Sequence, residues 1–235
     1  DPMMMQERWF YAHPNQKVIA EQVETFGISK LLATILVARN IGNGVHEDIQ
    51  DFITPPQSLV RDYTHLSQEK ELQAAFKRVK QAIANKDSVL INGDPDADGI
   101  SGTTVLVAGL RELGLDVHYD FPIRSKEGHG IQPRIIENAT KLGCNLIISA
   151  DCGSKDIETI EYATEQEIDV IITDHHVLGK TWPKALAMIN PHTIKERNPM
   201  HSLSGSVVCL KFIIALFDYL NKEINESLFN FIIGI

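Results

Sequence analysis

Three aspartates at alternate positions follow an apolar run and could together hold a divalent cation. Residues 88–92 have the length and composition of a short buried strand, and Asp94, Asp96 and Asp98 come directly after it. Carboxylates this close repel one another, and proteins usually tolerate them where a hard cation neutralises their charge. The spacing therefore predicts a metal site where a strand leads through a loop into the next helix.

Polar residues recur further along the chain, each after another strand-like run. They are Arg124, Asp151, the triplet Asp174-His175-His176, and Asn190-Pro191-His192. The carboxyl ends of parallel strands meet at one edge of a sheet, so we expect these side chains to share one crevice with the three aspartates. A set of carboxylates and imidazoles favours Mn2+ or Mg2+ over calcium or a thiolate-bound zinc.

A calcium loop of the helix-loop-helix type begins with a similar Asp-x-Asp-x-Asp-Gly string. Counting from Asp94, the twelfth position is Val105, where that loop needs a bidentate glutamate. The preceding segment also reads as a strand rather than a helix. Both observations argue against calcium.

The other acidic and histidine residues can each be explained without a metal site. The Asp-His-His triplet could be a solvated turn, and Asp151 could do no more than start a helix. Adjacent side chains diverge, so we expect at most one of His175 and His176 to bind a given metal. The other would meet a phosphate or a neighbouring ligand.

Two segments could contact an anion. Arg124 begins a glycine-containing stretch over residues 124–130, which is either a phosphate contact or a flexible surface turn. Ser204 and Gly205 precede an apolar helix predicted over residues 207–220. Small residues at a helix start expose backbone N–H groups that suit an anion, although ordinary capping explains them equally well.

The elements that must position these residues alternate along the chain. Strand-like runs occur at 88–92, 115–121, 145–150, 168–173 and 186–190, and helical periodicity occurs at 67–84, 101–113, 133–142 and 155–166. This alternation predicts an α/β fold with a mostly parallel five-stranded sheet flanked by helices. Helical periodicity over about residues 16–54 predicts a small helical N-terminal subdomain. The expected boundaries are 1–56 for that subdomain, 57–87 for a connecting segment and helix, and 88–235 for the α/β domain.

Composition excludes some classes of protein. A net charge of −9 argues against a chain that coats nucleic acid through a general positive field, but not against a nuclease whose acids bind cations. The three cysteines show no zinc or redox spacing, which favours reduced thiols and a cytoplasmic location. The longest apolar stretch, 207–220, contains Lys211 and Asp218 and is too short to cross a bilayer, so no membrane association is expected.

Taken in order, residues 92–99, Asp151 and Asp174-His175-His176 resemble the DHH phosphoesterase superfamily. The resemblance is closest to its RecJ branch of single-stranded-DNA exonucleases and covers roughly residues 66–235. It is supported by Arg124 after Pro122, by the segment 189–191 and by the small residues at 203–205. It implies a metal-dependent hydrolase that removes nucleotides from the 5′ end of single-stranded DNA during DNA repair and recombination.

The resemblance also implies roles for particular residues. Asp96, Asp98, Asp151 and His175 would be metal ligands, with Asp94 supporting or joining them and Asp151 bridging two ions. His176 would contact the scissile phosphate. These implied roles give a catalytic set and a set that contacts the substrate phosphate. The catalytic set is Asp96, Asp98, Asp151, His175 and His176; the phosphate set is Arg124, His176, Ser204 and Gly205.

The chain ends in an apolar pattern over residues 228–235 with no polar stop, so we expect it to be part of a longer protein. The resemblance implies a further metal-binding aspartate and a second domain beyond it, and hence an incomplete second metal site and a fragment that could lack activity. Single-stranded DNA and DNA-repair proteins are the expected partners, and the chain is expected to be a monomer. Short oligonucleotides, cyclic dinucleotides or polyphosphate are alternative substrates, and a non-catalytic DNA-binding scaffold is an alternative of another class.

Overall fold

Two units make up the part of the chain that the computed structural model describes, which is residues 13–41, 49 and 60–234. The units are Asp1–Val60 and Arg61–Ile235. In the first, α1 (Gln16–Phe26) and α2 (Lys30–Ala38) begin at Asn15 and Ser29, whose side chains each accept a backbone N–H of their own helix. The remainder of the predicted helical stretch, 42–48 and 50–54, lies outside the described residues.

The second unit is built on a five-stranded parallel sheet, which confirms the predicted α/β class. The strands are β1 (Ser88–Gly93), β2 (Asp116–Asp120), β3 (Cys144–Ala150), β4 (Asp169–Thr173) and β5 (Ala187–Ile189). Their order is β2-β1-β3-β4-β5, and every neighbouring pair is parallel. The apolar, β-branched composition of β1, β3 and β4 fits strands that are covered on both faces.

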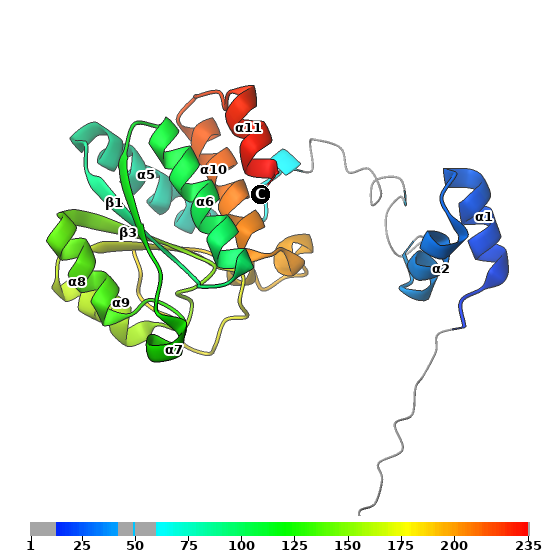
Figure 1. Ribbon diagram of the computed structural model, residues 1–235, viewed down its shortest axis with the longest axis horizontal. Coiled ribbons are helices and arrows are strands. Elements are labelled where there is room, and N and C mark those ends of the chain that lie inside the picture. The colour runs from blue at the N-terminus through cyan, green and yellow to red at the C-terminus, as the bar shows by residue number, and fades with distance from the viewer. Residues whose placement is uncertain (1–12, 42–48, 50–59, 235) are drawn as a thin grey trace, which may run out of the picture. The chain divides into compact units, whose positions relative to one another are not determined.

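Helices cover both faces of this sheet (Figure 1). They are α5 (Glu69–Asn85), α6 (Ala97–Glu112), α7 (Arg124–Glu127), α8 (Pro133–Leu142), α9 (Ile157–Glu165), α10 (Gly205–Tyr219) and α11 (Glu226–Ile233), with the 3-10 turns η1 (Pro191–Thr193) and η2 (Pro199–Ser202). Figure 1 shows α6 and α10 on one side of the sheet and α8 and α9 on the other. In α10 every residue from Val208 to Phe217 is buried, so this helix lies at the centre of one layer.

The order of the strands dictates where a ligand can bind. The chain runs outward from β1 to β2 and then returns to place β3 on the other side of β1. At such a reversal the loops after the two central strands diverge and leave a crevice at their carboxyl ends. The three aspartates follow β1 and Asp151 follows β3, so both segments lie at this reversal.

Helix α6 begins four residues earlier than predicted. Asp96 is its N-cap, because its Oδ1 accepts the backbone N–H of Gly99 at 3.0 Å. Asp98 consequently lies in the first turn of α6 rather than in a loop, a position that favours a carboxylate. Residues 124–127, which could have been a flexible turn, form the short helix α7.

A buried arginine joins three strands at the opposite edge of the sheet. Arg78, on α5, donates to the carboxylates of Asp87 and Asp169 at 3.1 and 2.5 Å and to the side-chain oxygen of Asn145 at 3.0 Å. These partners lie at or just before the starts of β1, β3 and β4. Only 8% of the Arg78 side chain is exposed. It therefore neutralises the nearly buried Asp87 together with Asp169, whose side chain is 45% exposed.

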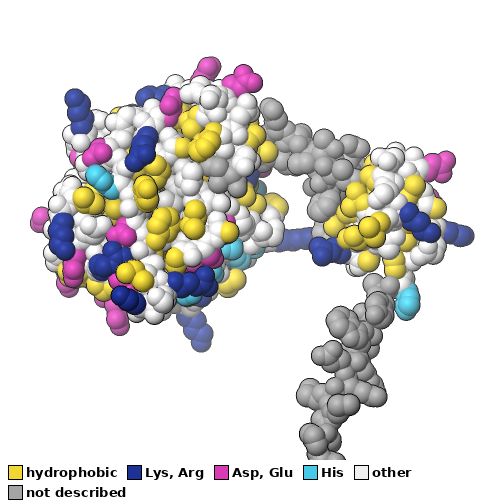
Figure 2. All heavy atoms as spheres, viewed as in Figure 1, with side chains coloured by type: hydrophobic (Ala, Val, Ile, Leu, Met, Phe, Trp, Pro, Cys, Tyr) yellow, Lys and Arg dark blue, Asp and Glu magenta, His cyan; other side chains and the backbone are white. Residues whose placement is uncertain are grey.

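No helix within the described residues is long and apolar enough to cross a membrane. Figure 2 shows basic and acidic side chains interspersed over one face of the second unit. This mixture agrees with the absence of a general positive field expected from the net charge of −9.

Candidate metal centre

Asp151 lies at the centre of the crevice, directly after β3. Its backbone has φ +63°, a left-handed conformation that aspartate tolerates better than most residues and that is enriched at functional sites. The residue is 3% exposed, and its Oδ1 accepts no hydrogen bond from the described residues. A buried carboxylate oxygen of this kind is costly unless it meets a cation.

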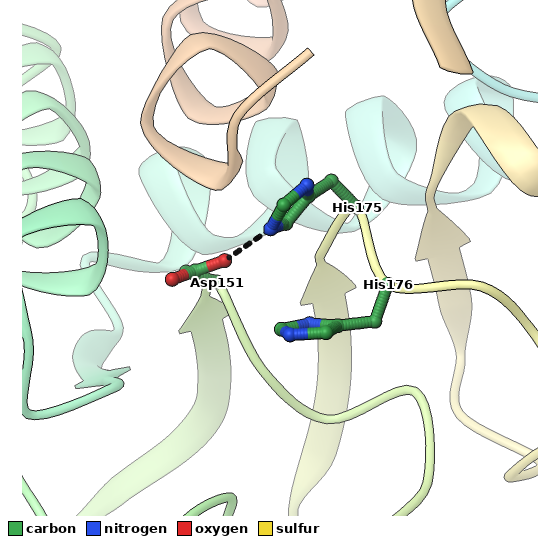
Figure 3. A group of neighbouring side chains, drawn as sticks. All are labelled: Asp151, His175 and His176. Atoms are coloured by element: carbon green, nitrogen blue, oxygen red, sulfur yellow. Dashed lines mark ion pairs between the residues drawn. The ribbon is translucent and has the colours of Figure 1, made fainter. Parts of the chain in front are cut away.

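The Asp-His-His segment faces Asp151 from the loop after β4. Nε2 of His175 lies 3.1 Å from Oδ1 of Asp151 (Figure 3). The His175 and His176 rings lie side by side, with centroids 4.8 Å apart. Adjacent side chains were expected to diverge, and they do not. The reason is that Asp174 accepts both backbone N–H groups of the pair and Nδ1 of His176 at 2.7 Å, which turns that ring back beside its neighbour.

Asp98 is held differently from the other two aspartates that follow β1. Its two carboxylate oxygens accept the backbone N–H groups of Gly205 and Ser206 at 2.8 and 2.7 Å, at the start of α10. Nε2 of His175 is 3.8 Å from the same carboxylate. A Cβ at Gly205 would collide with Oδ1 of Asp151, so only glycine permits α10 to begin this close to the crevice.

Two groups of side chains have the spacing of metal ligands. Asp151, His175 and His176 form one, and Asp94, Asp96 and Asp151 form the other; in each, the ligand atoms lie within 4.8 Å of one another. Asp151 belongs to both groups. Carboxylate oxygens with imidazole nitrogens suit Mn2+ or Mg2+. The observation that makes a cation fit is the buried Oδ1 of Asp151, which accepts no hydrogen bond and has Nε2 of His175, another ligand atom, 3.1 Å away.

The acids of the centre have widely different pKa values. Burial, with repulsion from Asp98 and Asp174, raises the pKa of Asp151 to about 8. Burial also raises the pKa of Asp174, but hydrogen bonds from His176 and Ser154 outweigh it and lower that pKa to about 2. The hydrogen bond to Asp174 raises the pKa of His176. Asp151 is therefore the acid whose charge the fold leaves for a cation to neutralise.

The structure brings most of the predicted site residues into one cleft. Its lining consists of Asp94, Asp96, Asp98, His129, Gly130, Asp151, Cys152, Gly153, Ser154, Lys155, Asp156, Asp174, His175 and His176. Arg124, Ser204 and Gly205 lie outside that lining. Arg124 is exposed on α7, and the N–H of Gly205 is used by Asp98. Their assignment to the substrate phosphate stays a prediction.

Lys155 and Asp156 line the cleft but were not among the predicted site residues. Both lie in the turn between Asp151 and α9, which was read as the start of that helix. Lys155 is exposed, whereas burial raises the pKa of the Asp156 carboxyl. The sequence did contain an indication that they face the crevice. A turn that follows a ligand at the end of a strand also faces the crevice, and these two residues lie four and five positions after Asp151.

Asn190 connects three segments of the centre. Its Nδ2 donates to the carbonyl oxygen of His176 at 3.0 Å and to Oγ of Ser154 at 3.1 Å, and its Oδ1 accepts the N–H of His192 at 2.9 Å. The residue is fully buried. Because Ser154 in turn donates its N–H to Asp174 at 3.0 Å, Asn190 holds the Asp-His-His segment against the turn after Asp151.

We predict that Asn190→Ala weakens Mn2+ binding by about 10-fold, the size of effect that removal of a supporting partner has at metal sites. Isothermal titration calorimetry measures it. The matched control is Asn198→Ala. Asn198 also makes three hydrogen bonds, to Pro191, Met200 and His65, but none to the Asp-His-His segment. It should lower stability to a similar extent and leave the Mn2+ affinity unchanged; equal affinities in both variants would contradict the prediction.

Comparison with known proteins gives a consistent result. Residues 88–234 match the family model described as DHH family, N-terminal domain. The chain is 32% identical over 217 residues to the single-stranded-DNA-specific exonuclease RecJ of Bacillus subtilis (strain 168), covering 92% of this chain and 27% of that protein. It is 36% identical over 143 residues to RecJ of Dickeya dadantii (strain 3937), covering 60% and 25%. The chain thus spans about a quarter of the length of these relatives.

Solved structures show the same similarity. A crystal structure of exonuclease RecJ bound to manganese superposes with a TM-score of 0.60 at 31% identity, covering 66% of this chain and 39% of that one. RecJ from Thermus thermophilus in complex with Mn2+ gives a TM-score of 0.64 at 25% identity, covering 91% and 29%. The fold described above is thus similar to that of exonuclease RecJ solved with manganese.

Proposed function

Because the chain belongs to the DHH family, we propose that it is the metal-binding part of a phosphodiester hydrolase that removes nucleotides from the 5′ end of single-stranded DNA. The observation that carries this proposal is the pair of ligand groups that share Asp151. Relatives named as single-stranded-DNA-specific exonucleases support the substrate. A cytoplasmic role in DNA repair and recombination, as a monomer with repair proteins as partners, belongs to the same proposal.

The metal would be Mn2+ or Mg2+, held by His175 with Asp151 on one side and by Asp94, Asp96 and Asp151 on the other. Bound there, such ions lower the pKa of a water molecule and neutralise charge on a phosphate. Asp98 is assigned to the same metal centre as a further ligand. Its carboxylate lies 3.8 Å from Nε2 of His175. Asp174 orients the imidazole pair and keeps the second ring nitrogen of His176 available.

The substrate's phosphate requires donors beside these acids. Nδ1 of His176 is used by Asp174, so Nε2 of that half-exposed ring is the group we assign to the scissile phosphate. Lys155, exposed at the cleft, and Arg124, on α7, are the basic side chains we assign to the flanking backbone. Ser204 and Gly205, at the start of α10, are also assigned to the substrate phosphate.

The test, on the full-length protein, is release of labelled mononucleotides from single-stranded DNA carrying the label at its 5′ end, with Mn2+ present and with Mn2+ removed by a chelator. We expect activity with Mn2+ alone, and loss of at least about 100-fold in His175→Ala, because a direct ligand contributes more than the 10- to 100-fold of a supporting partner. The control is His201→Ala, since His201 contacts the Ile194 carbonyl rather than the acids.

Wild-type activity of His175→Ala would overturn the assignment of the metal centre. Release from the 3′ end first would overturn the polarity. Hydrolysis of only short oligonucleotides, cyclic dinucleotides or polyphosphate would replace the substrate. Binding of single-stranded DNA with no hydrolysis in Mn2+ or Mg2+ would favour the non-catalytic scaffold.

A further inference from the structure

His129 contacts one of the acids of the metal centre from a loop of its own. Its Nδ1 lies 3.3 Å from Oδ1 of Asp94 in hydrogen-bonding geometry, and Asp94 belongs to the group formed with Asp96 and Asp151. A carboxylate offers only acceptors, so Nδ1 of His129 carries the proton of this bond. His129 was considered only as part of a loop that could meet phosphate, and no role at the metal centre was expected of it.

The backbone on both sides of His129 is specialised. Gly128 and Gly130 have φ +82° and +81°, a region that side chains rarely adopt. At Gly130 a Cβ would also lie 2.5 Å from an oxygen of Asp156, so no other residue fits. The two glycines thereby present His129 to the cleft on a tight bend.

The bend is fastened at both ends. After it, the Asp156 carboxylate accepts the backbone N–H of Ile131 at 2.7 Å, and Ile131 is buried in the core. Before it, Glu127 at the end of α7 accepts Nε of Arg134 at 2.8 Å, and Arg134 also donates to Asp120 on β2. His129 is therefore held in place from the sheet edge and from the turn after Asp151.

We propose that His129 is a positioning residue that orients the Asp94 carboxylate for the cation. This inference rests on the proposed metal site and adds an imidazole to its acidic group. Its ligand atoms are not within 4.8 Å of the whole group Asp94, Asp96 and Asp151, which is why it acts through Asp94 rather than as a further ligand. The ring is 60% exposed, so its role is the hydrogen bond and not the packing of the core.

The experiment is titration of the chain with Mn2+ alone, without substrate, by calorimetry and by the loss of the electron paramagnetic resonance signal of free Mn2+. His129→Phe keeps the ring but not the donor, and we expect its Mn2+ affinity to fall about 10-fold. In His129→Asn the amide nitrogen can take the place of Nδ1, so the affinity should stay within about 3-fold of wild type.

A matched control lies elsewhere on the unit. His118 makes a similar contact through Nε2 to Asp116 at 3.2 Å on β2, away from the cleft residues, and His118→Phe should leave Mn2+ affinity unchanged. Wild-type affinity in His129→Phe, or a loss in His129→Asn as large as in the phenylalanine variant, would overturn the inference. Unchanged binding in Asp151→Asn would instead overturn the proposed metal site, so the two failures are distinguishable.

Discussion

Replacing Asp151 by asparagine is expected to abolish metal binding and at the same time to make the metal-free chain more stable. The substitution keeps the shape of the side chain and its tolerance of φ +63°. It removes a charge that belongs to both ligand groups, so the Mn2+ affinity should fall by more than about 100-fold and hydrolysis should be lost with it.

The gain in stability follows from the pKa of Asp151, about 8 in the folded chain against 3.8 ordinarily. An acid whose pKa is raised by folding destabilises the fold most above its folded pKa, because the folded chain must then hold a buried charge that water solvates freely in the unfolded chain. The cost in wild type accumulates between about pH 4 and pH 8. At pH 8 we expect Asp151→Asn to raise the free energy of unfolding by about 2–4 kcal/mol.

Urea unfolding of both proteins with a chelator present, at pH 4 and at pH 8, measures this effect. The difference in free energy should be near zero at pH 4 and largest at pH 8. Addition of saturating Mn2+ at pH 8 should stabilise wild type and not the variant. A variant less stable than wild type at pH 8 would show that Asp151 is not under electrostatic stress in the metal-free fold.

The second large effect concerns stability alone. Arg78→Met should lower the free energy of unfolding of the second unit by about 3–5 kcal/mol, because the Asp87 carboxylate, 10% exposed, would lose its buried partner. For a unit of this size that corresponds to a fall in Tm of about 6–20 °C. Differential scanning calorimetry of the metal-free chain measures it.

The control is Arg134→Met. Arg134 also joins two acids, Asp120 and Glu127, but 39% of its side chain is exposed, and such ion pairs contribute about 1 kcal/mol or less. Since water can replace the guanidinium there, the loss should be small. Equal losses in the two variants would mean that the burial of Arg78 contributes nothing beyond its charge.

Much of the α/β unit was predictable because its strands and helices have distinct periodicities. The five strands and the helix Pro133–Leu142 agree with the predicted ranges closely, since apolar or alternating runs of five to seven residues leave few alternatives. The predicted start of α6 was wrong because Asp96 and Asp98 resemble loop residues in the sequence. In the structure Asp96 caps the helix and Asp98 lies in its first turn.

The crevice was predictable for a different reason. Residues that follow parallel strands must meet at one edge, so Asp151 and the Asp-His-His triplet could be placed together before any contact was known. The side-by-side imidazoles were not, because their arrangement depends on three hydrogen bonds to Asp174. The contact of His129 with Asp94 depends likewise on the bend that Gly128 and Gly130 make, which no periodicity reveals.

The three aspartates after β1 are attached to different parts of the second unit. Asp98 is bonded to the first amides of α10, the helix most deeply embedded in the core, and Asp96 caps its own helix. Asp94 instead meets a half-exposed ring on a two-glycine bend. Ions of different radius need slightly different ligand distances, and Mg2+ is the more exacting. Because each aspartate is fixed by a separate part of the second unit, a substitution at one attachment should change the ligand distances of that aspartate alone, and binding of the more exacting ion should suffer most.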